Sequence, residues 1–335
     1  MVFHKTSGFR IMIVCAAVII LSLLYCAKEP FEITYEQVDA HIKYLSSDEL
    51  KGRDPFSEDI HLTVDYIAEQ FKKAGLKEFG QFPGYKHDFG YTRRNRRNPD
   101  DPGTEYTLTN VIGYVEGTDP VLKDEFIMFS AHFDHMGIGR PVEGDSIYNG
   151  AEDNATGTTA VMALAEYFAK NGGNKRSIMF VGFTAEERGM IGSTQLVRDL
   201  PIDSVNLKAM VNFEMIGKPN DAGRAECFVT GWSRSDLGPI LVASLGDDPF
   251  LLNKGPEMAE YLYTGSDNRP FGRAGFVAHT IGGVKSAGDE FYHRPNDHYE
   301  TLDVNNMVTV IKGVIKASAT LLSGEAAPKN IERER

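Results

Sequence analysis

Cysteine is scarce in this 335-residue sequence, which contains only Cys15, Cys26 and Cys227. The first two lie within or directly after an apolar stretch near the N-terminus. If Cys26 is lipidated, the folded part of the chain keeps only Cys227. No disulfide bond could then form within it, and its stability must come from a packed core.

A surplus of basic charge is also absent. Lysine and arginine number 35 against 47 aspartates and glutamates, which gives a formal net charge of −12. Nucleic-acid binders normally carry a basic surface, so this balance argues against a nucleic-acid partner. An acidic chain can attract cations, but its charge alone does not name a partner.

Long apolar runs are missing except for one stretch of 15 residues, 11–25. This length is short for a membrane span and is typical of a signal sequence. The basic residues Lys5 and Arg10 precede the stretch and Cys26 follows it, an order that resembles a bacterial lipoprotein. We expect residues 1–26 to be a signal peptide with a lipobox-like cysteine, and a retained signal anchor is the alternative. Either predicts an exported bacterial protein, periplasmic or at the cell surface, anchored to the membrane.

The rest of the chain alternates short apolar runs with amphipathic helical patterns. Helical spacing is visible at 35–47 and 59–76, and again at 157–170 and 303–322. This alternation predicts an α/β fold, a three-layer αβα sandwich whose mixed sheet is mostly parallel. We expect one domain over 27–323. The sequence "GEAAPKNIERER", residues 324–335, lacks apolar content and predicts a disordered tail.

Polar side chains follow several of the predicted strands, at the edge where open α/β sheets place their sites. His132 follows the run "FIMFSA", Glu186 and Glu187 come shortly after "IMFVGF", and Glu214 follows "AMVNF". Asp153 lies in a loop of small residues before a helix. Acids gathered at one edge would repel one another unless cations neutralise them. Imidazole and carboxylate ligands together suit zinc, with manganese or cobalt as chemical alternatives.

Two points stay open from the residues alone. Paired glutamates such as Glu186 and Glu187 usually mark only a solvated helix face. A further imidazole for a metal could come from His293 or His298, which both precede the last predicted helix.

Six motifs together resemble a known family. They are, in order, "AHFDH", "GAEDNATG", "EERGMIGS", "NFEMIG", "YTGSDNRPF" and "YHRPNDHYET". They resemble the co-catalytic di-zinc aminopeptidases of metallopeptidase family 28. This superfamily of zinc exopeptidases also contains glutamate carboxypeptidases and glutaminyl cyclases. The resemblance runs from about residue 35 to about 322, and it implies a zinc-exopeptidase (phosphorylase/hydrolase-like) fold.

The resemblance implies a set of ligands for two zinc ions per chain. His132 and Glu214 correspond to the ligands of one zinc, and Asp153 to the carboxylate that bridges both. Glu187 and His293 correspond to the remaining ligands of the second zinc.

The resemblance also implies roles next to the metals. Glu186 corresponds to the general base, and Tyr292 to the phenol that stabilises the oxyanion. Asp134 corresponds to the acceptor of the other imidazole N–H of His132, a contact that fixes a metal-bound tautomer.

The sequence departs from the family pattern at two positions. Glu214 stands where many members have aspartate, so its side chain is one methylene longer. His298 replaces a small hydroxyl residue that often follows the aspartate of the last motif. The resemblance assigns no direct role to His135, Asp267 or His298.

The leading interpretation is a metallo-aminopeptidase that hydrolyses N-terminal residues from peptide substrates. A free α-ammonium group could lie beside Glu186 and Glu214. Three arginines in or near the last two motifs keep a carboxypeptidase-type member possible: Arg269, Arg273 and Arg294. A glutaminyl cyclase, which uses one zinc, is the nearest enzymatic alternative, and a non-catalytic surface binding protein is the alternative from another class.

Overall fold

The structure, a computed structural model, describes residues 29–331 except 96, 99 and 287. The chain divides into two compact units, Met1–Glu32 and Ile33–Arg335, and the second carries all of the helices and strands named here. The predicted signal segment and Cys26 lie outside the described residues. None of the described helices is long and apolar enough to cross a membrane.

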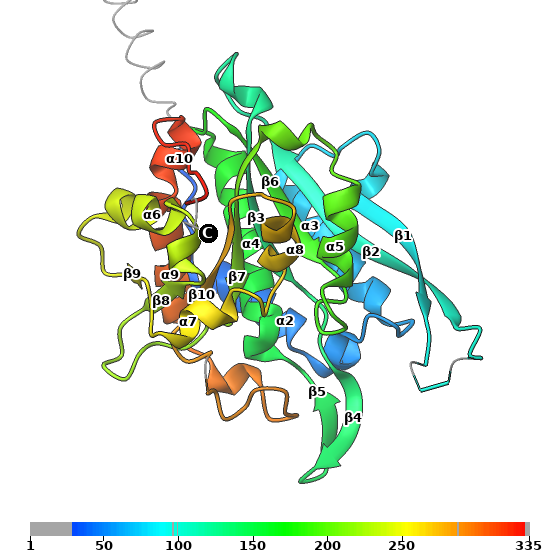
Figure 1. The fold of residues 1–335 in the computed structure, drawn as a ribbon. Helices are drawn as coiled ribbons and strands as arrows, with labels where there is room; N and C mark the ends of the chain where they lie inside the picture. Colours follow the sequence, from blue (N-terminus) through cyan, green and yellow to red (C-terminus); the bar gives the residue numbers. More distant parts are fainter. Residues whose placement is uncertain (1–28, 96, 99, 287, 332–335) are drawn as a thin grey trace, which may run out of the picture. The chain divides into compact units, whose positions relative to one another are not determined.

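The second unit is built on an eight-stranded sheet (Figure 1). In spatial order its strands are β1 (Lys86–Arg93), β2 (Thr104–Val115), β6 (Ser177–Phe183), β3 (Phe126–His132), β7 (Leu207–Glu214), β10 (Ala278–Gly283), β8 (Glu226–Val229) and β9 (Leu251–Asn253). The four strands β6, β3, β7 and β10 run parallel to one another. Strand β2 pairs antiparallel with both β1 and β6, and β8 pairs antiparallel with β10 and parallel with β9.

Helices cover both faces of this sheet, which confirms the predicted three-layer α/β class. One face is covered by α2 (Tyr35–Leu45), α3 (Ile60–Ala74), α4 (Thr156–Asn171) and α9 (Val304–Ala317). The other face is covered by α5 (Ile191–Arg198) and α8 (Asn268–Arg273), on the near side in Figure 1. The remaining helices are α6 (Leu237–Leu245), α7 (Met258–Leu262) and α10 (Ala319–Ser323), and β4 (Gly137–Val142) pairs with β5 (Asp145–Tyr148) as a separate hairpin.

Burial of the central strands explains their unbroken apolar sequences. Every residue of β3 and of β6 is buried, because helices cover both faces of these strands. Met128 of β3 and Met179 of β6 pack in one cluster with Leu196 of α5 and Phe271 of α8. The core on this face therefore fastens α5 and α8 to the central strands.

The structure differs from the predicted disordered tail over residues 324–331. The main chain of Lys329 exchanges hydrogen bonds with Asp236, and Arg176 donates to the carbonyl oxygen of Ala326. Pro328 is buried. Backbone hydrogen bonds and the buried Arg176 hold this segment in place. Neither kind of contact requires apolar residues, so the composition of the segment did not predict them.

Candidate metal centre

Neighbouring parallel strands bring the predicted residues to one edge of the sheet. His132 is the last residue of β3 and Glu214 the last residue of β7, while Glu186 and Glu187 follow β6. Since β6, β3 and β7 are adjacent and parallel, their carboxyl ends meet. Asp153 reaches the same edge from a π-helical turn, η4 (Ala151–Ala155), directly before α4.

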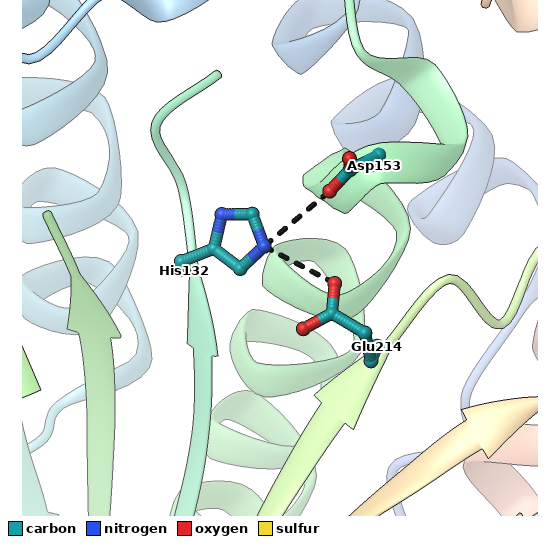
Figure 2. A group of neighbouring side chains, drawn as sticks. All are labelled: His132, Asp153 and Glu214. Atoms are coloured by element: carbon teal, nitrogen blue, oxygen red, sulfur yellow. Dashed lines mark hydrogen bonds and ion pairs between the residues drawn. The ribbon is translucent and has the colours of Figure 1, made fainter. Parts of the chain in front are cut away.

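Asp153 lies between two groups of side chains. Nε2 of His132 is 3.4 Å from Oδ1 of Asp153 and 3.1 Å from Oε1 of Glu214. Dashed lines mark these two contacts in Figure 2. Nε2 of His293 is 3.2 Å from Oδ2 of Asp153 and 3.1 Å from Oε2 of Glu187. Each oxygen of Asp153 thus faces a different imidazole, the arrangement that a carboxylate shared by two cations requires.

His135 joins the second group, although the sequence left its role open. Its Nδ1 is 2.9 Å from Oε1 of Glu187 and 3.7 Å from Oδ2 of Asp153. Two groups able to hold a metal ion are found among the described residues, His132 with Asp153 and Glu214, and His135 with Asp153 and Glu187. The motif "AHFDH" contains this histidine, but sequence alone could not show that it turns toward Glu187.

Asp134 holds the backbone of the paired glutamates. Its carboxylate accepts the N–H of Glu186 at 3.0 Å and that of Glu187 at 3.3 Å. Nδ1 of His132 lies nearer to the Asp134 main-chain oxygen, at 3.1 Å, than to its carboxylate, at 3.7 Å. Asp134 therefore orients the turn after β6 through its carboxylate, and the imidazole of His132 mainly through its main-chain oxygen.

Hydrogen bonds from other segments hold the turn that carries Asp153. The carboxylate of Asp297 accepts the N–H groups of Glu152, at 3.0 Å, and of Asp153, at 3.1 Å. The amide of Asn154 donates to the carbonyl oxygen of Phe213 at 2.8 Å, next to Glu214. The turn and strand β7 are thereby joined where their two carboxylates meet.

The extra methylene of Glu214 is accommodated within the site. While Oε1 faces His132, Oε2 accepts a hydrogen bond of 2.6 Å from the hydroxyl of Ser266. Both oxygens of this longer side chain therefore have partners within the site.

Opposed charges in a buried space dominate the electrostatics. Burial opposes protonation of His132, but the carboxylates of Glu214, Asp134 and Asp153 outweigh it and hold the imidazole pKa well above its usual value. Burial would likewise raise the pKa of Asp153, yet hydrogen bonds from His132 and His293 hold it well below normal. These imidazoles and carboxylates fit divalent metal ions, which would neutralise the acids in place of protons.

Glu186 and Glu187 have different surroundings, which excludes the solvated-face interpretation. The side chain of Glu187 is only 6% exposed and faces His135 and His293. For Glu186, burial raises the pKa well above normal, helped by the charges of Asp267 and Glu214. The two adjacent carboxylates therefore differ in their partners and in the direction of their pKa shifts.

A cavity of about 730 Å³ opens onto these residues. Its polar end is formed by His132, Asp153, Glu186, Glu214 and Tyr292, and its wall includes Met215, Phe228, Pro256, Met258 and Leu262. The ring of Tyr292 stacks on that of His293, with 3.8 Å between centroids. The site therefore joins an acidic, metal-capable end to a largely apolar chamber.

Two other polar residues of the motifs lie outside the metal-capable groups. Asp267 is fully buried, and burial raises its pKa to about 7. His298 instead lies 3.2 Å from Asp145 of strand β5.

Comparison with known proteins identifies the family. Residues 110–318 match the model of Peptidase family M28. The chain belongs to Peptidase family M28. This confirms the resemblance found in the sequence. A probable zinc metalloprotease of Pyrenophora tritici-repentis is 27% identical to this M28 chain over 235 residues, 62% of this chain and 50% of the relative. The M28 chain thus spans half the length of that curated relative.

Solved structures show the same fold at low sequence identity. The LapA aminopeptidase of Legionella pneumophila matches with a TM-score of 0.65 and 20% identity, over 87% of this chain and 72% of LapA. A glutaminyl cyclase of Bacteroides thetaiotaomicron matches with a TM-score of 0.66 and 16% identity, over 87% of this chain and 99% of the cyclase. Since the two TM-scores are nearly the same, the M28 fold by itself does not choose between peptide hydrolysis and cyclisation.

Proposed function

We propose that this M28 chain is a zinc-dependent aminopeptidase that removes apolar N-terminal residues from peptides. The observation that carries the proposal is the placement of Asp153 between two imidazole–carboxylate groups, at the acidic end of an apolar cavity. The family membership and the half-length match to a probable zinc metalloprotease support it.

The donor set supports two zinc ions per chain. His132, Asp153 and Glu214 would hold one ion, and Asp153, Glu187 and His293 the other. In the second group Oε2 of Glu187 faces His293 while Oε1 faces His135, so His135 would hold the ligand in place by donating to its free oxygen. Bound zinc would supply polarisation of the scissile carbonyl and a lowered pKa for the attacking water.

Glu186 is proposed as the general base. Burial raises its pKa, which brings the carboxylate closer to the pH range where a base can both accept and release a proton. It would take the proton from the attacking water and deliver it to the nitrogen of the leaving amine. Burial also raises the pKa of Tyr292, so its hydroxyl stays protonated at neutral pH and can donate to the developing oxyanion.

The lining of the cavity favours a free N-terminus over a free C-terminus. None of the described residues that line it is lysine or arginine, while Glu186 and Glu214 can face an ammonium group. Arg269 and Arg273 line a separate cavity between α5 and α8, and Arg294 lines another one beside His298. A substrate carboxylate would therefore lack a cationic partner, and the apolar wall suits an apolar first side chain.

Matched peptides with a leucine, aspartate or lysine N-terminus, each free and N-acetylated, test the proposal in the presence of zinc. We expect release of free leucine to be fastest and acetylated peptides to resist cleavage. Equal cleavage of free and acetylated peptides would contradict N-terminal polarity. A further peptide with N-terminal glutamine tests for cyclisation, because ammonia release from it without peptide cleavage would indicate a cyclase. No turnover with tight peptide binding would indicate a binding protein.

We also propose that the protein is exported and anchored to the membrane by a lipid on Cys26. The order of basic residues, apolar stretch and cysteine supports this. In a bacterial host, metabolic labelling with an acyl chain should mark the wild type and not Cys26→Ser. Equal labelling of both proteins, or labelling of neither, would reject the lipid anchor.

A further inference from the structure

A buried arginine lies behind the metal-capable side chains. Arg53 ends the short 3₁₀ segment η1 (Asp48–Arg53), in a stretch whose sequence, "SSDELKGRDP", predicts no more than a polar connection. Only 1% of its surface is exposed. A guanidinium so deeply buried must have partners for its N–H groups, since burying an unpaired charged donor is strongly unfavourable.

Those partners are main-chain oxygens of three separate segments. Nε donates to the carbonyl oxygen of Phe133 at 2.6 Å, and Nη2 donates to that of Gly150 at 2.8 Å. Nη1 donates to the carbonyl oxygens of Leu45, at the end of α2, and of Asn149. In the other direction, the carbonyl oxygen of Arg53 accepts the N–H of His135 at 3.1 Å.

These contacts join the two loops that carry the proposed zinc ligands. Phe133 directly follows His132, and Gly150 lies shortly before Asp153. The Nε2–Oδ1 distance of 3.4 Å between His132 and Asp153 thus depends on two loops that meet at one guanidinium.

An unusual backbone conformation around Arg53 directs its side chain toward these two loops. Lys51, Gly52 and Arg53 all have positive φ angles, of 48°, 70° and 54°. A Cβ atom on Gly52 would lie 2.5 Å from the carbonyl oxygen of Tyr148 and 2.7 Å from that of Gly137. Only glycine allows this close approach to the β4–β5 hairpin, which turns the next side chain inward.

The guanidinium also places a positive charge beside the acids. Burial lowers its pKa to about 10, and the charges of Asp153, Asp297 and Asp134 oppose that decrease. The group stays charged at neutral pH. It therefore offsets part of the mutual repulsion of these carboxylates when no metal is bound.

We propose that Arg53 is a positioning residue for metal binding, which holds the His132 loop and the Asp153 loop together and balances their carboxylates. The inference rests on the proposed zinc site. It requires arginine rather than lysine, because the planar fork reaches carbonyl oxygens in several directions while an ammonium is a compact point charge.

The experiment compares Arg53→Lys and Arg53→Met with a matched pair at Arg176. Arg176 is also buried, 3% exposed, and also donates to main-chain oxygens, those of Leu321 and Ala326. It directly precedes β6, at the end of the strand opposite Glu186. Zinc dissociation constants are measured by competition with a chromogenic chelator, alongside thermal unfolding of the metal-free proteins.

We expect Arg53→Lys to weaken zinc binding by about 10–100-fold, the usual effect of losing a partner behind a metal site. Arg53→Met, which also loses the charge, should bind zinc more weakly still. Arg176→Lys and Arg176→Met should lower the unfolding temperature and leave the zinc affinity of the folded protein unchanged. Excess zinc should recover the activity of Arg53→Lys and have no such effect on Arg176→Lys.

A milder variant covers the case in which the Arg53 variants do not fold. The side chain of Asn149 donates to Ser46 and Asp48 and so ties the same loop without touching the zinc ligands. Asn149→Ala should weaken zinc binding in the same sense. Unchanged zinc affinity in folded Arg53→Lys or in Asn149→Ala, or an equal loss in Arg176→Lys, would overturn the inference. Failure of the wild type to bind zinc would instead contradict the proposed function.

Discussion

At the residue scale, the contrast between Glu186 and Glu187 is the most informative feature. Their amide nitrogens are held by the same carboxylate, that of Asp134, yet their side chains reach different surroundings. Glu187 faces two imidazoles, whereas burial among like charges raises the pKa of Glu186. These different surroundings are the reason for proposing one as a metal ligand and the other as the general base.

This contrast predicts that the isosteric amides of the two glutamates fail differently. Glu186→Gln should keep its zinc, because no ligand is lost, but hydrolysis should fall by about 10²–10⁴-fold. Its KM should change less, since the base acts mainly in the transition state. Glu187→Gln should lose zinc from one site, and excess zinc should restore part of its activity.

Metal analysis and kinetics on the two purified variants decide the matter. Full zinc content with near-normal turnover in both would show that neither glutamate takes part. Loss of zinc from Glu186→Gln would instead make that residue a ligand.

His41 predicts a loss of stability in acid that is independent of the metal site. Burial, with a smaller contribution from the charge of Lys73, lowers its pKa from 6.5 to about 4. Between these values the unfolded chain binds more protons, so the free energy of unfolding decreases as the pH falls. The contribution is complete above pH 6.5 and is lost toward pH 4. It amounts to about 3 kcal/mol, at about 1.4 kcal/mol for each pKa unit.

Urea unfolding of metal-free protein between about pH 7 and about pH 4 measures this contribution. His41→Gln should show a smaller decrease in stability over that range than the wild type. His61→Gln, at an exposed position of α3, should behave as the wild type does. Parallel curves for His41→Gln and the wild type would mean that His41 takes up its proton equally in both states.

At the scale of elements, the turns beyond the strand ends make the site. The central strands supply a rigid, buried edge, and short turns carry His132, Asp153 and the glutamates into contact. Gly150, at the start of the Asp153 turn, has a φ of 58°. A Cβ there would lie 2.3 Å from the carbonyl oxygen of Asp153 and 2.5 Å from the ring of His135.

Gly150→Ala is therefore expected to reduce both stability and zinc affinity. The left-handed backbone alone costs about 1–2 kcal/mol with a side chain, and the contacts must also shift. Gly144→Ala, in the β4–β5 hairpin, is the matched control, because its φ is 94° and nothing lies within 4 Å of a Cβ there. Urea unfolding should show a loss in both variants, and zinc titration a loss only in Gly150→Ala. Equal zinc affinity in the two would show that the turn tolerates the displacement.

At the scale of the whole molecule, the chain has a net charge of −12, and several of its acidic residues are buried together at one edge of the sheet. Zinc bound there should stabilise the entire second unit, since the site exists only when strands, turns and η1 are assembled. Ligand binding to the folded state alone contributes about 2.7 kcal/mol at a concentration about 100 times the dissociation constant.

Thermal unfolding with and without zinc tests this expectation. The midpoint should rise with zinc and fall again with a chelator, while magnesium at the same concentration should have a smaller effect on an imidazole-containing site. Asp153→Asn, which weakens the carboxylate shared by both groups, should respond much less to zinc. An unchanged midpoint in the wild type would argue against metal ions at this edge.

The sequence by itself determined the α/β class, the family and the edge at which the site would form. Buried parallel strands need nearly continuous apolar residues, so most of the charged side chains come only where such a strand ends. His132, Glu186, Glu187 and Glu214 could therefore be placed at one edge before any contact was known. Local pattern is sufficient for the fold class and the edge, because each depends on the burial of its own segment, while the order of the six motifs indicated the family.

Only the tertiary structure decided the features that depend on distant segments. Three such features left no periodic signal in the sequence. They are the contact of His135 with Glu187, the hydrogen bonds from Arg53 to two loops, and the backbone hydrogen bonds of the tail up to residue 331. In each case the partner is a main-chain oxygen or a side chain remote in sequence. A hydrogen bond to a carbonyl oxygen imposes no residue type on the acceptor, so the sequence of the accepting segment carries no trace of the contact.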